Sequence, residues 1–232
     1  METWLPQAAL QYRPAELRVL SRKLSTARSR TGAYRCLMPG LAPDPVPSSS
    51  AGSPEWQTAL LVAVPAAEAA VGEHRARLDA SARHGVPAHL TVLYPFLPPS
   101  QVSQAVLGSL AGLFAGVPAF GFTLDRVAWF GDGVVWLAPQ DAAPFRELTA
   151  LAGRAFPACV PYGGQFADVV PHLTVGHLGD LAARQAAGDA VGRRLPIVAR
   201  AAEVTLMSGP APGDPAARPG RWRRLAAFPL GR

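Results

Sequence analysis

The chain has 232 residues, of which 49% are hydrophobic and 16% are charged. This length allows one large domain or two packed lobes, and the apolar content excludes a mainly disordered chain. Two cysteines, Cys36 and Cys159, are too few for a disulfide framework and fit a reducing compartment. No apolar run is long enough to span a membrane. We therefore expect a cytoplasmic protein without membrane contact.

Half of the net charge of +6 lies in residues 1–56, which are rich in Arg, Pro and Ser. Such a segment has little apolar surface to offset its ordering entropy, and it lacks the apolar stretch of a signal peptide. We expect a poorly ordered basic extension over 1–56, with a transit peptide or a nucleic-acid-binding arm as alternatives. The rest of the chain is only mildly basic, which favours a compact phosphate-bearing ligand over a long nucleic-acid track.

A folded domain is expected over 57–232, and its first part has regular turn signals. Gly85 is typical of a helix end, Ser100 of a helix N-cap, and Gly131-Asp132-Gly133 of a hairpin turn. Apolar and alternating runs predict strands over 58–64, 88–95, 120–130 and 134–138. Helices are expected over 66–84 and 102–114.

The remainder repeats this order of elements. Helices are expected over 141–156 and 181–194, and a Gly/Pro-rich loop over 157–167. Strands are expected over 170–177, 197–207 and 222–228. The whole pattern predicts an α+β fold of two related lobes.

One tetrapeptide occurs twice. His89-Leu90-Thr91-Val92 recurs as His172-Leu173-Thr174-Val175, 83 residues later, in a chain with five histidines. Because side chains alternate along a strand, the histidine and threonine of each copy share one face while the leucine and valine share the other. The apolar pairs are therefore expected in the core, and the polar pairs are expected to face a shared site.

Two imidazoles at one site can act as acid and base near neutral pH. Threonine hydroxyls two residues further along can hydrogen-bond the oxygens of a group held between the histidines. A phosphodiester suits this arrangement because it has non-bridging oxygens to bind and a leaving oxygen that must be protonated. Since the imidazoles supply the proton transfers, no metal or other cofactor is expected.

The paired motif resembles the signature of the two-histidine (2H) phosphoesterase superfamily. The stretch from Val86 to Phe96 is similar to the first motif of the bacterial 2'-5' RNA ligase family. The resemblance implies a bilobal fold of two pseudo-symmetric lobes, each an antiparallel sheet flanked by helices, with the active site between them. It also implies hydrolysis of 2',3'-cyclic phosphates, cleavage of related diesters, or 2'-5' joining of RNA ends.

Carried over to this chain, the resemblance makes His89 and His172 the catalytic pair and Thr91 and Thr174 the phosphate ligands. The family's usual division of labour would have His89 protonate the leaving oxygen and His172 activate water, although the symmetric motifs alone assign neither role. The expected partners are RNA ends or small cyclic nucleotides, bound by a monomer. Tyr94, close to the first motif, is a possible substrate contact.

Other interpretations of these residues are less consistent with the whole pattern. A metal site of His172, His177 and Asp180 would leave the first motif unexplained and lacks a regular ligand spacing. His177 would lie on the opposite face of a regular strand from His172, which indicates a structural or surface residue. RNA ligation would use the same residues in the reverse sense. A non-catalytic module that binds RNA ends is the alternative outside enzymes, but it would not need a second histidine.

Overall fold

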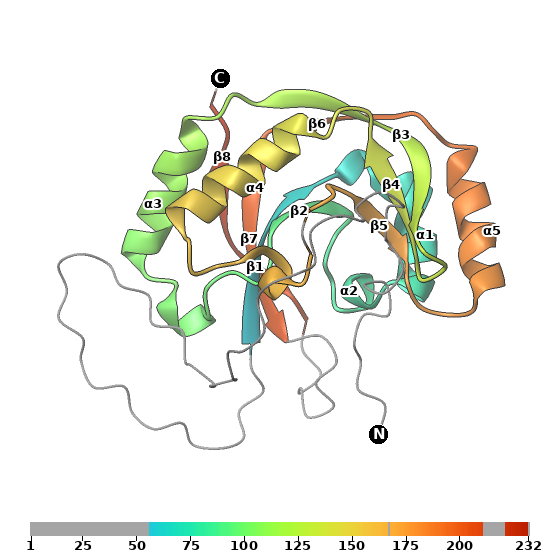
Figure 1. The fold of residues 1–232 in the computed structure, drawn as a ribbon, viewed down its shortest axis with the longest axis horizontal. Helices are drawn as coiled ribbons and strands as arrows, with labels where there is room; N and C mark the ends of the chain where they lie inside the picture. Colours follow the sequence, from blue (N-terminus) through green and yellow to red (C-terminus); the bar gives the residue numbers. More distant parts are fainter. Residues whose placement is uncertain (1–55, 167, 211–220, 232) are drawn as a thin grey trace, which may run out of the picture.

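The computed structural model describes residues 56–166, 168–210 and 221–231. The expected extension over 1–56 lies outside the described residues except for Trp56, where the first strand begins. The described part folds into two four-stranded sheets whose paired strands are all antiparallel, with helices against them (Figure 1). The predicted α+β class and the two-lobed architecture are confirmed.

The first sheet combines the beginning and the end of the folded domain. Its strand order is β2-β1-β7-β8, and the strands span β1 Trp56–Ala63, β2 His89–Leu93, β7 Glu203–Pro210 and β8 Arg223–Pro229. The second sheet is built from the middle of the chain in the order β5-β4-β3-β6. Its strands span β3 Phe120–Phe130, β4 Val134–Pro139, β5 Leu173–Gly176 and β6 Ile197–Ala201. In each sheet the strand that carries the tetrapeptide is an edge strand.

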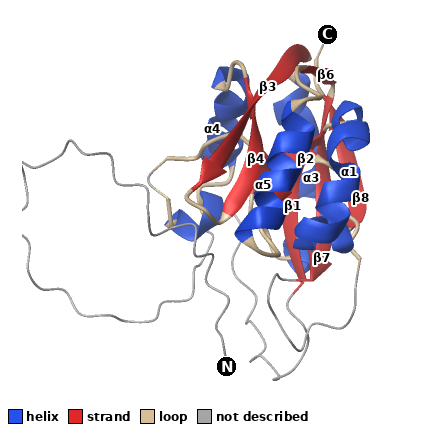
Figure 2. Cartoon of the chain, turned by 90° about the vertical axis from the view of Figure 1, so that its right-hand side faces the viewer, coloured by secondary structure: helices blue, strands red, loops and turns tan. Residues whose placement is uncertain are grey.

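The helices connect the two sheets by crossed packing. Helix α1, which links β1 to β2, packs on β5, whereas α4, which links β4 to β5, packs on β2. Helix α5 lies beside α1 and covers β3 and β4, and α3 packs on β8 (Figure 2). The helices span α1 Pro65–Leu78, α2 Ala80–Arg83, α3 Gln104–Ala115, α4 Ala143–Ala155 and α5 Leu181–Gly192, and short 3-10 turns span Pro99–Gln101 and Pro161–Gly164.

One hydrophobic cluster runs through both lobes, and the apolar halves of the two tetrapeptides belong to it. Leu90, Leu173 and Val175 are fully buried, and Val92 is 2% exposed. The period-two prediction for these four side chains is therefore confirmed. Both motif strands place their apolar faces in the same core. Because side chains alternate along a strand, the His and Thr side chains must then point away from that core.

Some element boundaries differ from the prediction for local reasons. The helix expected over 66–84 is interrupted at Asp79, whose backbone is extended and whose carboxylate accepts from the Ser81 amide to start α2. Helix α3 is capped by Ser103, which accepts from Val106 N, whereas Ser100 lies in the preceding 3-10 turn. In both cases a side chain satisfies a free amide at a helix start, and this sets where the helix begins.

The strand expected over 197–207 is two strands in different sheets. β6 ends at Ala201 and pairs with β3, while β7 begins at Glu203 and pairs with β1 and β8. A continuous alternating pattern does not reveal which neighbour each segment pairs with, so the change of sheet at Ala202 was missed.

We predict that Gly176→Ala destabilises the protein, because α1 and β5 approach too closely for a side chain. A Cβ on Gly176 would lie 2.7 Å from the Leu78 Cβ. The expected loss in free energy of unfolding is about 1–3 kcal/mol, as for other overpacked cores. Urea denaturation measures it.

Gly112→Ala is the matched control, because this exposed helical position has nothing within 4 Å of a new Cβ. It should raise the free energy of unfolding by about 0.5–1 kcal/mol. Equal effects of the two substitutions would contradict the close contact between α1 and β5.

Candidate active site

The two tetrapeptides meet in space although they belong to different sheets. β2 and β5 contact each other near the middle of the molecule (Figure 1). His89 and Thr91 are half-buried and alternate with buried neighbours along β2. On the other side, Thr174 lies in β5 and His172 directly precedes this strand, both half-buried. All four residues that the sequence singled out are thus brought to one region.

Both imidazoles are anchored in the same way. The Nδ1 atom of His89 lies 2.7 Å from the Pro87 carbonyl oxygen, and Nδ1 of His172 lies 2.7 Å from the Val170 carbonyl oxygen. A carbonyl oxygen can only accept a hydrogen bond, so Nδ1 carries the proton in each ring. In the neutral imidazole this leaves Nε2 as the atom with a free lone pair, available for proton transfer.

The surrounding protein favours the neutral form of both rings. Burial is the main cause that lowers the pKa of His89 to about 4, and the Arg75 guanidinium lowers it further against the opposing effects of the Pro87 carbonyl and Asp79. Charge repulsion from His172 is a further, smaller cause that lowers this pKa. Burial lowers the pKa of His172 as well, opposed by its hydrogen bond to Val170.

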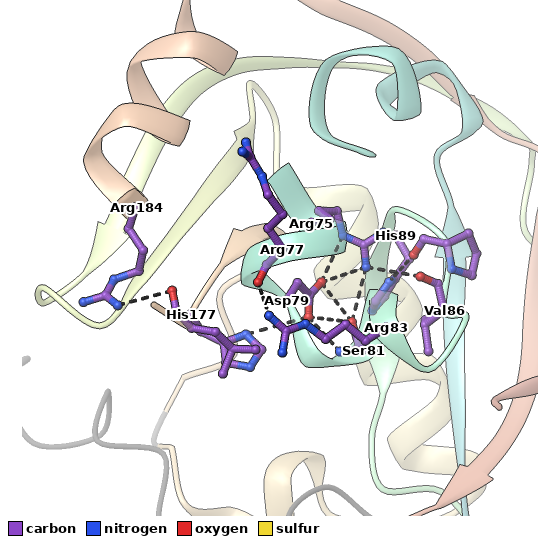
Figure 3. A network of polar contacts seen from close by, with 11 residues as sticks. Arg75, Arg77, Asp79, Ser81, Arg83, Val86, His89, His177 and Arg184 are labelled. Carbon is purple, nitrogen blue, oxygen red and sulfur yellow. Dashed lines mark hydrogen bonds and ion pairs between the residues drawn. The ribbon is translucent and has the colours of Figure 1, made fainter. Parts of the chain in front are cut away.

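A buried polar network lies behind His89 (Figure 3). Arg75, in the last turn of α1, and Asp79, directly after the helix, are 2% and 1% exposed and form an ion pair of 2.8 Å. Arg75 also donates to Ser81 Oγ at 3.2 Å and to the Val86 carbonyl oxygen at 3.3 Å. Two buried charges are costly to desolvate unless their remaining hydrogen-bonding groups are satisfied, which this network achieves.

The network holds the segment that presents His89. Val86 comes three residues before this histidine, and Ala88 N donates to the Glu68 carboxylate at 2.6 Å, so α1 binds the segment at two points. From the second lobe, His177 Nδ1 lies 3.7 Å from Asp79 Oδ1 (Figure 3). His177 therefore points into this network, in agreement with the structural role expected for it.

His172 has aromatic rather than charged neighbours. The rings of Phe130 and Trp136 lie 5.0 Å and 5.7 Å from its imidazole, both in edge-type geometry, and they stack on each other at 4.7 Å. Trp136 is paired with Thr174 across β4 and β5, which places its side chain on the same face as the threonine. Identical tetrapeptides thus have different surroundings.

Tyr94 lies directly after β2, and its ring is close to two other aromatic rings. Its ring centroid is 6.4 Å from that of Tyr162 and 6.3 Å from that of Trp222. Its hydroxyl donates to the Gln57 side chain. Burial raises the pKa of Tyr94 to about 12, so the phenol is protonated across the physiological range.

Arg75, Phe130, Trp136 and Tyr162 were not identified from the sequence as neighbours of the motifs. An arginine and an aspartate at i and i+4 inside an Ala-rich helix are a weak signal, because such pairs are usually solvent-exposed. In the sequence the aromatic residues cannot be distinguished from ordinary core residues, because only the assembled sheets bring them beside the motifs. Within the described ranges, no group of three or more His, Cys, Asp or Glu side chains could hold a metal ion.

The fold and the paired His-x-Thr motifs define a two-lobed α+β protein of the two-histidine phosphoesterase type. The family model described as the 2'-5' RNA ligase superfamily matches residues 63–211, more than half of the chain. The chain therefore belongs to this superfamily.

Solved structures of two bacterial proteins are similar to the chain. The crystal structure of the Thermus thermophilus protein TT0787 has a TM-score of 0.50 and 16% sequence identity, covering 76% of this chain and 99% of its own. Escherichia coli LigT complexed with 3'-AMP has a TM-score of 0.47 and 21% identity, covering 76% and 98%. No curated protein sequence matches the chain. In the part of the chain that the structure describes, no helix has the length and apolarity to cross a membrane.

We predict that Arg75→Gln raises the pKa of His89. The substitution removes the neighbouring positive charge and leaves the Asp79 carboxylate, which favours imidazolium. Titration of the imidazole nitrogens by NMR measures the change, and Arg75→Gln/Asp79→Asn, which removes both charges, is the control with a smaller expected rise. An unchanged pKa in Arg75→Gln would mean that burial alone sets it.

The same pKa shift predicts how stability depends on pH. An unfolded histidine binds a proton near pH 6.5, whereas His89 in the folded protein stays neutral down to about pH 4. The unfolded state therefore binds more protons in this window, so the free energy of unfolding falls as pH drops from about 6.5 to about 4.

Proposed function

We propose that the protein is a metal-independent phosphoesterase that hydrolyses 2',3'-cyclic phosphates at RNA ends or in small cyclic nucleotides. One observation carries the proposal: two imidazoles, one on β2 and one directly before β5, are anchored identically through Nδ1, and these two strands contact each other. Membership of the 2'-5' RNA ligase superfamily supports a phosphoesterase or ligase activity for this site.

In the proposed reaction, Nε2 of a neutral histidine removes a proton from water while the water oxygen forms a bond to phosphorus. The bond from phosphorus to one ribose oxygen breaks, and the other histidine, protonated, donates its Nε2 proton to that oxygen. The product is a ribose phosphate monoester. The hydroxyls of Thr91 and Thr174 donate hydrogen bonds to the non-bridging oxygens, which carry the developing negative charge.

The charge balance of the site bears on which histidine acts as the base. In the ligand-free protein, burial disfavours both imidazolium forms. A bound phosphodiester carries a negative charge, which stabilises a proton on one of the two rings. Arg75 opposes that proton on His89 but is not among the groups that shift the pKa of His172. The local field therefore favours His89 as base, the reverse of the family division of labour, and the Arg75→Gln titration bears directly on this choice.

RNA ligation is the second candidate, favoured by the description of the family. In that reaction a 5'-hydroxyl takes the place of water: one histidine removes its proton as its oxygen bonds to phosphorus, the bond from phosphorus to the 3'-oxygen breaks, and the other histidine protonates that oxygen, with the same phosphate contacts. Tyr94 belongs to the proposal as a surface against which a nucleobase could stack. We further propose that the protein acts in the cytoplasm as a monomer.

We predict that His89→Ala and His172→Ala each lower kcat for a nucleoside 2',3'-cyclic phosphate by about 10²- to 10⁴-fold, the usual contribution of a general acid or base. The wild-type assay is run in EDTA and should show a bell-shaped dependence of rate on pH. His84→Ala, an exposed histidine, is the control and should retain activity.

Full activity of either site variant would exclude the two-histidine mechanism, and complete inhibition by EDTA would indicate a metallohydrolase. Binding of RNA ends without turnover would favour the non-catalytic module. Product analysis with an added 5'-hydroxyl oligonucleotide separates hydrolysis from ligation.

We predict that Thr91→Val and Thr174→Val, which keep the side-chain shape, each lower kcat/KM by about 10-fold or more, the cost of one hydrogen bond to a charged group. Thr149→Val is the control, because the Thr149 hydroxyl donates to Phe145 O within α4. Equal kinetics for the site variants and the control would exclude the threonines as phosphate ligands.

A further inference from the structure

The loop between α4 and β5 reaches across to the first tetrapeptide. Tyr162, in the 3-10 turn Pro161–Gly164, donates its backbone N–H to the Tyr94 carbonyl oxygen at 2.6 Å. Tyr94 follows directly after β2, the strand that carries His89 and Thr91. A segment from the second lobe is thus bonded to the end of the motif strand of the first lobe.

The backbone at Tyr162 is in a conformation that side chains disfavour. Its φ of 50° and ψ of 30° lie in the left-handed region, and it is the only non-glycine residue with positive φ in the described ranges. The turn continues through Gly163 and Gly164, whose φ values of 62° and 76° are accessible to glycine. Residues held in this way are concentrated at functional sites, where the conformation directs a side chain that packing alone would not place.

This conformation directs the phenol ring toward the polar face of β2. The ring lies in edge geometry against Tyr94 at 6.4 Å and against Phe166 at 5.4 Å. Hydrogen bonding with the Thr91 side chain lowers the pKa of the Tyr162 hydroxyl, against the larger effect of burial. Burial raises the pKa of Tyr162, so its hydroxyl keeps its proton at neutral pH and remains a donor. The Tyr162 hydroxyl can therefore donate a hydrogen bond to an anion as an uncharged group.

We propose that Tyr162 is a further substrate-binding residue, whose hydroxyl donates to the same non-bridging phosphate oxygen as the hydroxyl of Thr91. The inference rests on the proposed function, since it assumes that Thr91 faces a phosphate. The hydroxyls of Tyr162 and Thr91, from different lobes, then bind one oxygen, so phosphate binding couples the turn Pro161–Gly164 to β2. A neutral donor also contacts the phosphate without adding a positive charge that would oppose protonation of the histidines.

The test compares Tyr162→Phe with the wild-type protein. This variant keeps the ring and removes only the hydroxyl, and Gln165→Ala, an exposed residue of the same loop, is the control for loop disturbance. Binding of inorganic phosphate and of a nucleoside 3'-monophosphate is measured by calorimetry, independently of turnover. We expect Kd for both to rise about 10-fold in Tyr162→Phe, the effect of losing a hydrogen bond to a charged group, and to be unchanged in the control.

Unchanged or tighter binding by a folded Tyr162→Phe variant would overturn the inference, because the Tyr162 hydroxyl would then interact with Thr91 alone and not with phosphate. Absence of phosphate binding by the wild type would also overturn it. If Tyr162→Phe loses its fold, as judged by circular dichroism, an NMR measurement on the wild-type protein decides the question. Phosphate should shift the signals of the Tyr162 ring protons next to the hydroxyl group. The absence of a shift would reject the contact. Wild-type turnover of a cyclic phosphate tests the proposed function separately, since Tyr162 can bind phosphate in a protein that does not hydrolyse the diester.

Discussion

The crossed packing of two helices holds the candidate site together. β2 and β5 are edge strands of separate sheets, and no backbone ladder joins them. Instead α1, which leads into β2, packs on β5, and α4, on the strand–helix–strand path to β5, packs on β2. Each strand that carries a motif is therefore packed against the helix that leads into the other motif strand. Since one apolar cluster fills the space between them, neither strand can move without disturbing both lobes.

Two identical tetrapeptides have the same anchor and different surroundings. Each histidine is oriented through Nδ1 by the carbonyl oxygen two residues before it, which is a local interaction. The neighbours beyond this anchor differ, with a buried guanidinium beside His89 and two aromatic rings beside His172. Acid–base chemistry needs two groups whose environments favour different protonation states, and unequal surroundings are the physical means of separating them.

The predictions from sequence were accurate where the physics is local. Alternation along a strand placed Leu90 and Leu173 in the core and their histidines on the other face, because successive side chains must point to opposite sides. The predictions failed where the pattern does not show which partner a residue takes. Residues 197–207 have one alternating pattern but serve two sheets, whose strands come from distant parts of the chain. At Asp79 a helix-forming stretch is interrupted, and its carboxylate binds the nearby Arg75 and Ser81.

The sequence by itself determined the two half-sites: which residues alternate, which face is apolar, and which family the paired motif resembles. Only the tertiary structure decided that the half-sites meet, that Arg75 lies beside one histidine, and that Tyr162 reaches Thr91 from the other lobe. The reason is the range of the interactions. A strand's period is set by neighbouring residues, whereas contacts between residues 14 to 83 positions apart depend on how the whole core packs.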